Sequence, residues 1–240
     1  MNDQEYSIRE SSDGFMGDPP PEDFAPTPPK VPGKFEVKPP AGSAIPGAFL
    51  VFLMTLSSLL SWQWPERFNL FQVSRAELFR DGQVWRIFSA LLGHGDFEHL
   101  FHNLPVFIFF AWILQGYFGL LASLILPILI GALSNVITVY FCDERVHLLG
   151  ASGMIYGMVA LWLVLYVRFD RGQWWAKKVL RAVGFSLLVL VPQTYDPTVS
   201  YLAHFSGFII GLGLGLIFLP VFEKTAPVAK EQNVSTEVSP

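Results

Sequence analysis

Charge and cysteine are scarce in this chain of 240 residues. Only 15% of the residues are charged and 52% are hydrophobic, whereas soluble domains carry about 25% charged residues. The single cysteine, Cys142, excludes an intrachain disulfide and a cysteine-rich metal cluster. The net charge of −4 leaves no dominant basic surface, so we expect no nucleic-acid partner. These shortages, with a mean hydropathy of +0.42, exclude an ordinary soluble enzyme.

Long runs without Asp, Glu, Lys or Arg show where the apolar residues gather. Five such runs cover residues 39–65, 99–142, 146–167, 182–195 and 197–222. The second run is long enough for two bilayer crossings, since each crossing needs about 20 mostly apolar residues. We therefore predict an all-α membrane protein built as a bundle of six transmembrane helices. The expected spans lie near 44–62, 97–115, 120–141, 150–168, 177–192 and 199–219.

The two ends of the chain differ from this bundle. Residues 1–42 contain nine of the eighteen prolines and eight acids against four bases. Such a composition buries too little apolar surface to offset the entropy of ordering. We expect a disordered, acidic, Pro-rich cytoplasmic tail at 1–42, a six-helix transmembrane domain at 43–220 and a short polar cytoplasmic tail at 221–240.

Lysines and arginines set the expected orientation, because they concentrate on the cytoplasmic side of membrane proteins. Five of them lie between residues 168 and 181, and Lys30, Lys34 and Lys38 precede the first helix. With six crossings these two groups share one face, which places both termini in the cytoplasm. The expected location is a bacterial inner membrane.

The first outer loop, residues 63–96, carries four arginines against this rule. Its charges alternate with aromatic and aliphatic residues, a pattern typical of segments that lie in the plane of the interface. We expect a half-immersed interfacial lobe, although an amphipathic loop packed on the bundle would have the same pattern.

Strongly polar residues inside membrane helices are costly and by default mark function. His99 and Asn103 share one face of the second helix, Ser152 opens the fourth, and His204 lies about one turn into the sixth. All three helices start outside in the expected topology, so the four side chains reach one depth. Each alone has an ordinary explanation as a packing or back-bonded residue. Their coincidence at one depth favours a functional site.

Chemistry can be assigned to these four residues. A serine hydroxyl becomes a nucleophile when a positioned base takes its proton, and His204 is the candidate base for Ser152. His99, Asn103 and the Ser152 backbone N–H are candidate donors to a developing oxyanion. No acid lies in the fourth or sixth helix to orient His204, so a hydrolase here would use a dyad.

Glycines four residues apart occur on the two helices that carry the dyad, at Gly153 and Gly157 and again at Gly207 and Gly211. Small residues at this spacing let membrane helices approach closely, which would bring the dyad together. The same spacing also serves simple bundle packing.

A metal site is the weaker reading of the histidines. His94, His99 and His102 lie close in sequence, but the chain contains no His-Glu-x-x-His, and the distance from His94 to Glu98 does not match an inverted zincin motif. We expect no metal and no other cofactor. His102 is expected to be a packing or interfacial residue, and His147 a solvated loop residue.

Together these motifs resemble the rhomboid family of intramembrane serine proteases. The resemblance covers residues 45–219, all six expected helices. It rests on Gly150-Ala151-Ser152-Gly153 with Tyr156, on Ala203-His204 with Gly207 and Gly211, on His94, His99 and Asn103, and on Trp85-Arg86.

The resemblance implies a role for each of these residues. Ser152 would be the nucleophile, His204 the general base and acid, and His99 and Asn103 part of the oxyanion hole. Tyr156 would pack against the His204 ring, His94 would support the water-facing side of the site, and Trp85 and Arg86 would anchor the first loop. One departure is Gln115, which stands where many bacterial members carry a glutamate that links to this loop.

The family cleaves single-pass membrane proteins near the outer interface, so the resemblance implies a serine endopeptidase whose partners are such substrates and the lipid bilayer. Two other functions stay open at this point. One is a non-catalytic rhomboid-like protein that binds or dislocates membrane clients. The other is a small transporter that relays protons over His99, His102 and His204.

Overall fold

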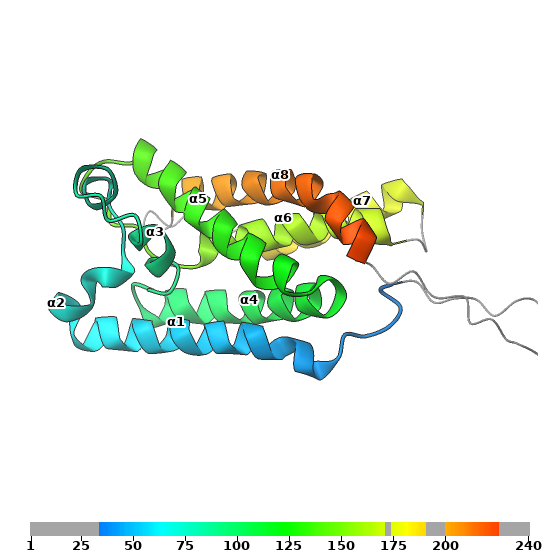
Figure 1. The fold of residues 1–240 in the computed structure, drawn as a ribbon, viewed down its shortest axis with the longest axis horizontal. Helices are drawn as coiled ribbons and strands as arrows, with labels where there is room; N and C mark the ends of the chain where they lie inside the picture. The colour runs from blue at the N-terminus through cyan, green and yellow to red at the C-terminus, as the bar shows by residue number, and fades with distance from the viewer. Residues whose placement is uncertain (1–33, 171–173, 191–199, 226–240) are drawn as a thin grey trace, which may run out of the picture. The chain divides into compact units, whose positions relative to one another are not determined.

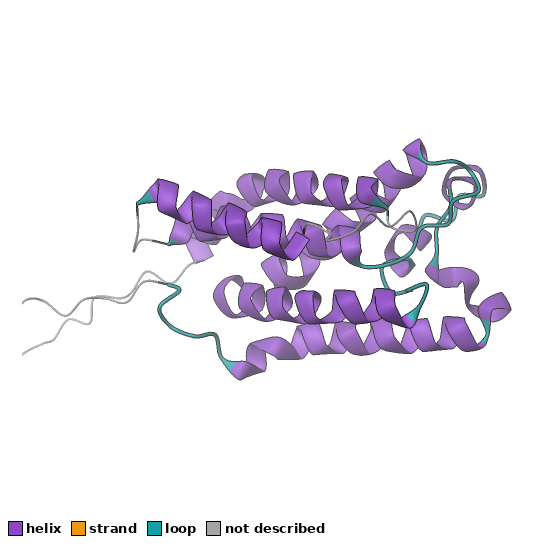
Figure 2. Ribbon diagram, turned by 180° about the vertical axis from the view of Figure 1, so that it is seen from behind, coloured by secondary structure: helices purple, strands orange, loops and turns teal. Residues whose placement is uncertain are grey.

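The structure is a computed structural model that describes residues 34–170, 174–190 and 200–225. Within these ranges the chain is helical and contains no β-strand, as Figures 1 and 2 show from opposite sides. The all-α prediction is therefore confirmed. The long helices are α1 (Ile45–Gln63), α4 (Phe97–Phe118), α5 (Leu126–Phe141), α6 (Ser152–Phe169), α7 (Trp175–Leu190) and α8 (Tyr201–Thr225).

Six short elements join or extend these helices. Four of them, including a π-helical turn at η4, build the first loop, and the other two precede α1 and α5. They are η2 (Ala41–Ala44), α2 (Pro65–Phe68), η3 (Asn69–Phe71), η4 (Ala76–Arg80), α3 (Arg86–Ser89) and η5 (Leu121–Ile125).

Five of the described helical segments are long and apolar enough to cross a membrane: Ala41–Gln63, Phe97–Phe118, Leu121–Phe141, Ser152–Phe169 and Tyr201–Lys224. The sixth expected span falls on α7, which has 16 residues. Lys177, Lys178 and Arg181 lie in its first turns. The expected end of this span near 192 lies outside the described residues. The chain is thus a multi-pass membrane protein, and its described residues include five helices of spanning length together with α7.

Helix α6 is the centre of the bundle. It packs against α4, α5, α7 and α8, whereas α1 packs along α4 (Figure 1). The approach of α6 to α8 is a backbone contact, since a Cβ atom on Gly207 would overlap the Gly153 carbonyl and one on Gly211 would overlap the Gly157 carbonyl. The predicted close approach of these two helices is present.

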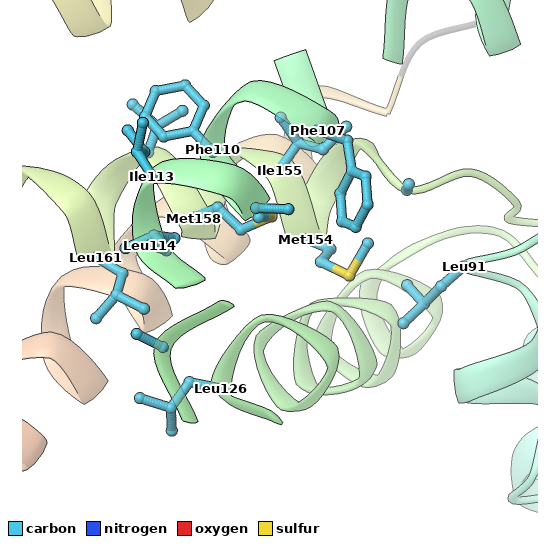
Figure 3. Packing of buried hydrophobic residues seen from close by; sticks show 14 of the residues in the cluster. Leu91, Phe107, Phe110, Ile113, Leu114, Leu126, Met154, Ile155, Met158 and Leu161 are labelled. Atoms are coloured by element: carbon cyan, nitrogen blue, oxygen red, sulfur yellow. The ribbon is translucent and has the colours of Figure 1, made fainter. Parts of the chain in front are cut away.

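The largest hydrophobic core lies between α4, α5 and α6, where Figure 3 shows Phe107, Phe110, Met154 and Met158 among the buried side chains. A second cluster lies under the first loop and ties it to α5. Its buried members include Val73, Leu78, Ile87, Ala90, Val139 and Leu148. The loop also exposes an apolar side with Phe79, Val84, Trp85 and Phe88. It therefore has one packed side and one apolar side free to meet the interface.

The chain before α1 is packed, which corrects part of the expected tail. Residues 1–33 lie outside the described residues, but residues 34–42 are described. The Phe35 ring lies 4.9 Å from Tyr117 and 5.2 Å from Trp162, centroid to centroid, and so touches both α4 and α6. The Tyr117 hydroxyl donates to the Val37 carbonyl at 2.9 Å. Composition alone missed this because one aromatic residue supplies the anchor.

The last helix also extends beyond its expected end near 219. Helix α8 continues to Thr225, with Pro220 inside it. Phe222 is 1% exposed and packs on Phe118, and Arg168 pairs with Glu223 at 2.6 Å. The boundary at 221 was therefore too early, because Phe222 continues the apolar face of α8 inside the charge-free run 197–222.

The anchoring of residues 34–40 is testable by replacing Phe35 with Ala. The variant loses ring contacts with α4 and α6, and we expect the free energy of unfolding to fall by about 2 kcal/mol. Thermal denaturation of the detergent-purified protein measures the change. Val37→Ala is the matched control, because the Val37 side chain is 59% exposed and its truncation leaves the hydrogen bond from Tyr117 to the Val37 carbonyl intact. Equal midpoints for the two variants would contradict the anchoring role.

Candidate active site

The N-terminal ends of α4, α6 and α8 surround a cavity of about 690 Å³. All four residues expected at one depth line it: Ser152, His204, His99 and Asn103. Gly150, Gly153 and Tyr156 are also in its wall, together with His102, Asn135, Cys142 and His147. The cavity is therefore lined by groups from α4, α5, α6 and α8 and from the loop that precedes α6.

Ser152 is the first residue of α6, and it is half-buried. Ala151, at the N-cap position, offers no side-chain hydrogen bond to the helix end. The first N–H groups of an α-helix have no partner within the helix, and the helix macrodipole favours negative charge there. The Ser152 hydroxyl is thus placed beside backbone donors at a helix terminus.

The His204 ring lies in the first turns of α8 and stacks on Tyr156. Their ring centroids are 4.0 Å apart and the planes differ by 15°. Tyr201 approaches the same imidazole edge-on, at 6.2 Å. Nδ1 of His204 is buried without a hydrogen-bond partner in the described part of the chain. Ring packing, chiefly with Tyr156, therefore orients this imidazole.

His99 and Asn103 lie one turn apart at the start of α4. Asp96 caps this helix, since its carboxylate accepts a hydrogen bond from the His99 backbone N–H at 2.7 Å. The Asn103 side chain is buried and donates one N–H to the His99 carbonyl at 2.9 Å. An amide nitrogen carries two hydrogens, so the second N–H of Asn103 stays available to a bound oxygen.

Gly150 gives the His99 ring its place. A Cβ atom at this position would lie 2.7 Å from Cε1 and 2.8 Å from Nε2 of His99. The φ angle of Gly150 is +114°, a conformation that residues with a side chain rarely adopt. Both the backbone turn into α6 and the space for His99 therefore require glycine here.

His94 lies behind His99 and not on the wall of this cavity. The two rings meet edge-on with centroids 5.0 Å apart. His94 instead lines a neighbouring cavity of about 740 Å³ with residues of α1 and the first loop. Nδ1 is 3.2 Å from the Ser58 hydroxyl, and Trp62 Nε1 donates to the His94 carbonyl at 2.7 Å. Helix α1 thus holds His94 against His99.

Burial keeps His94 neutral. Its side chain is 1% exposed, and desolvation, followed by the nearby His99, lowers its pKa from 6.5 to about 3. The Ser58 hydroxyl also lies 2.7 Å from the Met54 carbonyl, to which it donates. Nδ1 of His94 is then the donor to Ser58, since a hydroxyl has only one hydrogen.

The first loop holds the segment that leads into α6. Val73 and Leu148 exchange two backbone hydrogen bonds of 2.9 and 2.8 Å, and the Gly150 N–H donates to the Ala90 carbonyl at 2.9 Å. These bonds fix the residues immediately before Ser152. The position of α6 therefore depends on the loop between α1 and α4.

Arg86 in turn holds the loop together. It is 5% exposed, and its guanidinium donates to the Asn69 carbonyl at 2.7 Å and the Gln72 carbonyl at 3.0 Å. It also lies 3.4 Å from the Glu77 carboxylate and over the Trp85 ring. Trp85 and Arg86 do not touch the cavity, and they act on the loop that supports it.

Sequence reasoning missed several supporting residues. Ser74 and Glu77 form a reciprocal capping box at η4, with N–H to side-chain oxygen distances of 2.8 and 3.3 Å. Asn135 of α5 donates to the Ile87 carbonyl at 2.8 Å, and the neighbouring Ser134 bonds to α8. In the sequence, Ser134 and Asn135 stand out only as a pair of adjacent polar residues in a mostly apolar helix.

Three further residues were discussed from the sequence, and the structure now gives their contacts. His102 was expected to pack or face the interface, but it lines the cavity. His147 is 47% exposed, as a loop residue, and also lines the cavity, with Nδ1 3.9 Å from the Glu77 carboxylate. Gln115, at the far end of α4, accepts a hydrogen bond from Ser123 at 2.6 Å and so links to the turn before α5.

Comparison with known proteins shows the family of the chain. A family described as the Rhomboid domain matches residues 81–221, more than half of the chain. The chain belongs to the rhomboid family. The match includes every helix from α3 to α7 and most of α8, and with them each residue of the cavity wall.

Several named proteins are similar over the same region. The putative rhomboid protease YdcA of Bacillus subtilis is 28% identical over 57% of this chain and 68% of its own length. The rhomboid protease GlpG of Haemophilus influenzae is 27% identical over 58% of this chain and 71% of its own. RHOMBOID-like protein 5 of Arabidopsis thaliana is 26% identical, and the match spans 46% of that protein. The family and these relatives support intramembrane proteolysis in general.

The burial of His94 predicts a pH-dependent stability. Its pKa is lower in the folded chain than in the unfolded one, so its contribution is complete above about pH 6.5 and is lost as the pH falls toward 3. We expect the free energy of unfolding to lose about 2 kcal/mol by pH 5 through this group. Thermal midpoints of the wild type and of His94→Asn, measured from pH 8 to pH 4, should converge as the pH falls.

The control for this titration is His102→Asn, which removes an exposed histidine and should follow the wild-type pH dependence. A His94→Asn protein whose stability falls with pH as steeply as the wild type would contradict the buried, neutral state.

Proposed function

We propose that this chain is an intramembrane serine endopeptidase that uses a Ser152–His204 dyad. The observation that carries the proposal is the single cavity lined by Ser152, His204, His99 and Asn103, in which the His204 ring is stacked on Tyr156 at 4.0 Å. Membership of the rhomboid family and the similarity to YdcA and GlpG support this chemistry.

In the first step His204 takes the proton of the Ser152 hydroxyl while the serine oxygen attacks the scissile carbonyl carbon. The imidazole must present an unprotonated Nε2 to the serine, so the hydrogen of the neutral ring resides on Nδ1. Stacking on Tyr156 fixes the plane of the ring. The aromatic face then takes over the orienting role that an acidic residue has in a triad.

The negative charge of the tetrahedral intermediate would be held by three donors. The Ser152 N–H belongs to the uncapped first turn of α6, the second N–H of Asn103 is not used by the His99 carbonyl, and the His99 ring stands beside Gly150. One oxyanion donor is typically worth about 10²–10³ in kcat. The three come from α4 and α6, so the hole exists only when these two helices are in place.

The remaining steps return the enzyme to its starting state. The imidazolium of His204 gives its proton to the leaving amine, and the peptide C–N bond breaks to leave an acyl ester on Ser152. Water, activated by the neutral His204, then adds to the ester carbonyl, and the serine oxygen leaves with the proton. The volume of about 690 Å³ is sufficient for both a peptide segment and water.

The proposed substrates are single-pass membrane proteins, cleaved near the outer interface. In this arrangement both termini lie in the cytoplasm, and α4, α6 and α8 all begin at the outer face. The exposed Phe79, Trp85 and Phe88 of the first loop would sit at that interface. The proposed location is a bacterial inner membrane.

The test is cleavage of a single-pass reporter in proteoliposomes. Because the dyad residues act as one unit, Ser152→Ala and His204→Ala should each lower kcat by about 10³-fold or more. Ser186→Ala is the matched control, since its buried hydroxyl donates to the Ala182 carbonyl of its own helix at 2.8 Å. Mass spectrometry of the products locates the cleaved bond relative to the bilayer.

Each other function predicts a different outcome of this test. A protein that binds or dislocates clients would capture the reporter without cleaving it, and the Ser152→Ala protein would behave as the wild type. A proton-coupled transporter would show flux that survives loss of Ser152 and depends on His99, His102 and His204. Either result would overturn the proposed dyad.

A further inference from the structure

Ser134 of α5 touches both helices that carry the proposed dyad, at positions next to the dyad residues. Its hydroxyl is 2.8 Å from the carbonyl oxygen of Ala203, the residue before His204. It also lies 2.7 Å from where a Cβ atom of Gly153, the residue after Ser152, would be. One fully buried side chain thus contacts the neighbours of both Ser152 and His204.

The hydrogen bonds of Ser134 are interhelical. Its hydroxyl donates to the Ala203 carbonyl at 2.8 Å, and its oxygen is 3.0 Å from the Ser206 hydroxyl. Ser206, itself buried, is also 3.2 Å from the Ala203 carbonyl. A serine on a membrane helix ordinarily bonds back to its own helix, whereas the Ser134 hydroxyl bonds to a different helix, α8.

The glycines of α6 and α8 leave room for Ser134 between the two helices, and they also leave the helices without side chains that interlock at this level. With Gly153 and Gly207 in backbone contact, nothing but main chain separates α6 from α8 at this level. At these two glycines no side chain interlocks α6 with α8 to fix how far one helix slides along the other, and the Tyr156–His204 stacking joins the helices about one turn further on. A hydrogen bond from a third helix, directed at the first turn of α8, supplies that register.

We propose that Ser134 is a positioning residue that holds the first turn of α8 against α6, so that His204 faces Ser152 and Tyr156. The inference rests on the proposed function, because it concerns the geometry of that dyad. Loss of the hydroxyl leaves both catalytic side chains present and the substrate-binding surface unchanged. Its effect therefore falls on kcat and not on KM.

The experiment measures kcat, KM and the thermal midpoint for wild type, Ser134→Ala and Ser134→Cys in proteoliposomes, with the same single-pass reporter. Ser186→Ala is the matched control for loss of one buried serine hydroxyl. A small displacement of catalytic groups costs up to about 10²-fold in rate. We expect kcat of Ser134→Ala to fall about 10-fold or more, with KM within about twofold and a midpoint close to that of Ser186→Ala. Ser134→Cys, which keeps the volume and a weak donor, should recover part of the rate.

Several results would overturn the inference. They are a wild-type kcat in folded Ser134→Ala, a raised KM with kcat unchanged, and a loss of kcat that Ser186→Ala shares. If Ser134→Ala does not fold, Ser134→Cys decides by the same criteria. Ser152→Ala run in parallel separates this inference from the proposed function: cleavage that survives in Ser152→Ala refutes the dyad itself, whereas cleavage lost there and normal in Ser134→Ala refutes only the role of Ser134.

Discussion

The backbone contact between α6 and α8 is the constraint on which the rest of the structure depends. Gly153 faces Gly207 and Gly157 faces Gly211, and a Cβ atom on either α8 glycine would overlap an α6 carbonyl. Lipid tails give no hydrophobic force between helices, so close van der Waals packing and interhelical hydrogen bonds hold the pair together. The same closeness carries Tyr156 to the His204 ring. The glycine contact between α6 and α8 thus holds the bundle together and also brings the residues of the site together.

Around this pair the other elements act as supports at defined points. Helix α5 contributes Ser134 to α8 and Asn135 to the first loop. The loop, held by Arg86, fixes Leu148 and Gly150 before α6, the helix of the proposed nucleophile. Helix α1 holds His94, which backs the His99 ring. The first loop is therefore part of the site's framework as well as an apolar surface.

Much of this arrangement could be predicted from the sequence, because lipid imposes strong rules. The charge-free runs gave the long helices, and the glycine spacing predicted the crossing of α6 and α8. Ser152, His204, His99 and Asn103 were expected at one depth, and they line one cavity. The resemblance to rhomboids added Tyr156, whose stacking on His204 has no signal in periodicity.

The parts that sequence reasoning missed depend on single contacts. Phe35 anchors a segment whose composition is that of a disordered chain, and Phe222 keeps α8 packed beyond Pro220. His102 turns to the cavity although its spacing alone suggested a packing role. The bond from Ser134 to α8 was missed because a serine in a membrane helix usually bonds to its own backbone. Such contacts follow from tertiary packing and not from pattern.

The most direct measurement of the central claim is covalent labelling of the detergent-purified protein with a fluorophosphonate probe, with the modified residue located by mass spectrometry. The account predicts that the wild type is labelled on Ser152 alone, and that labelling disappears in His204→Ala while the protein stays folded. A folded wild-type protein that is not labelled, or labelling that persists in Ser152→Ala, would contradict the claim that the α6–α8 crossing activates Ser152 through His204.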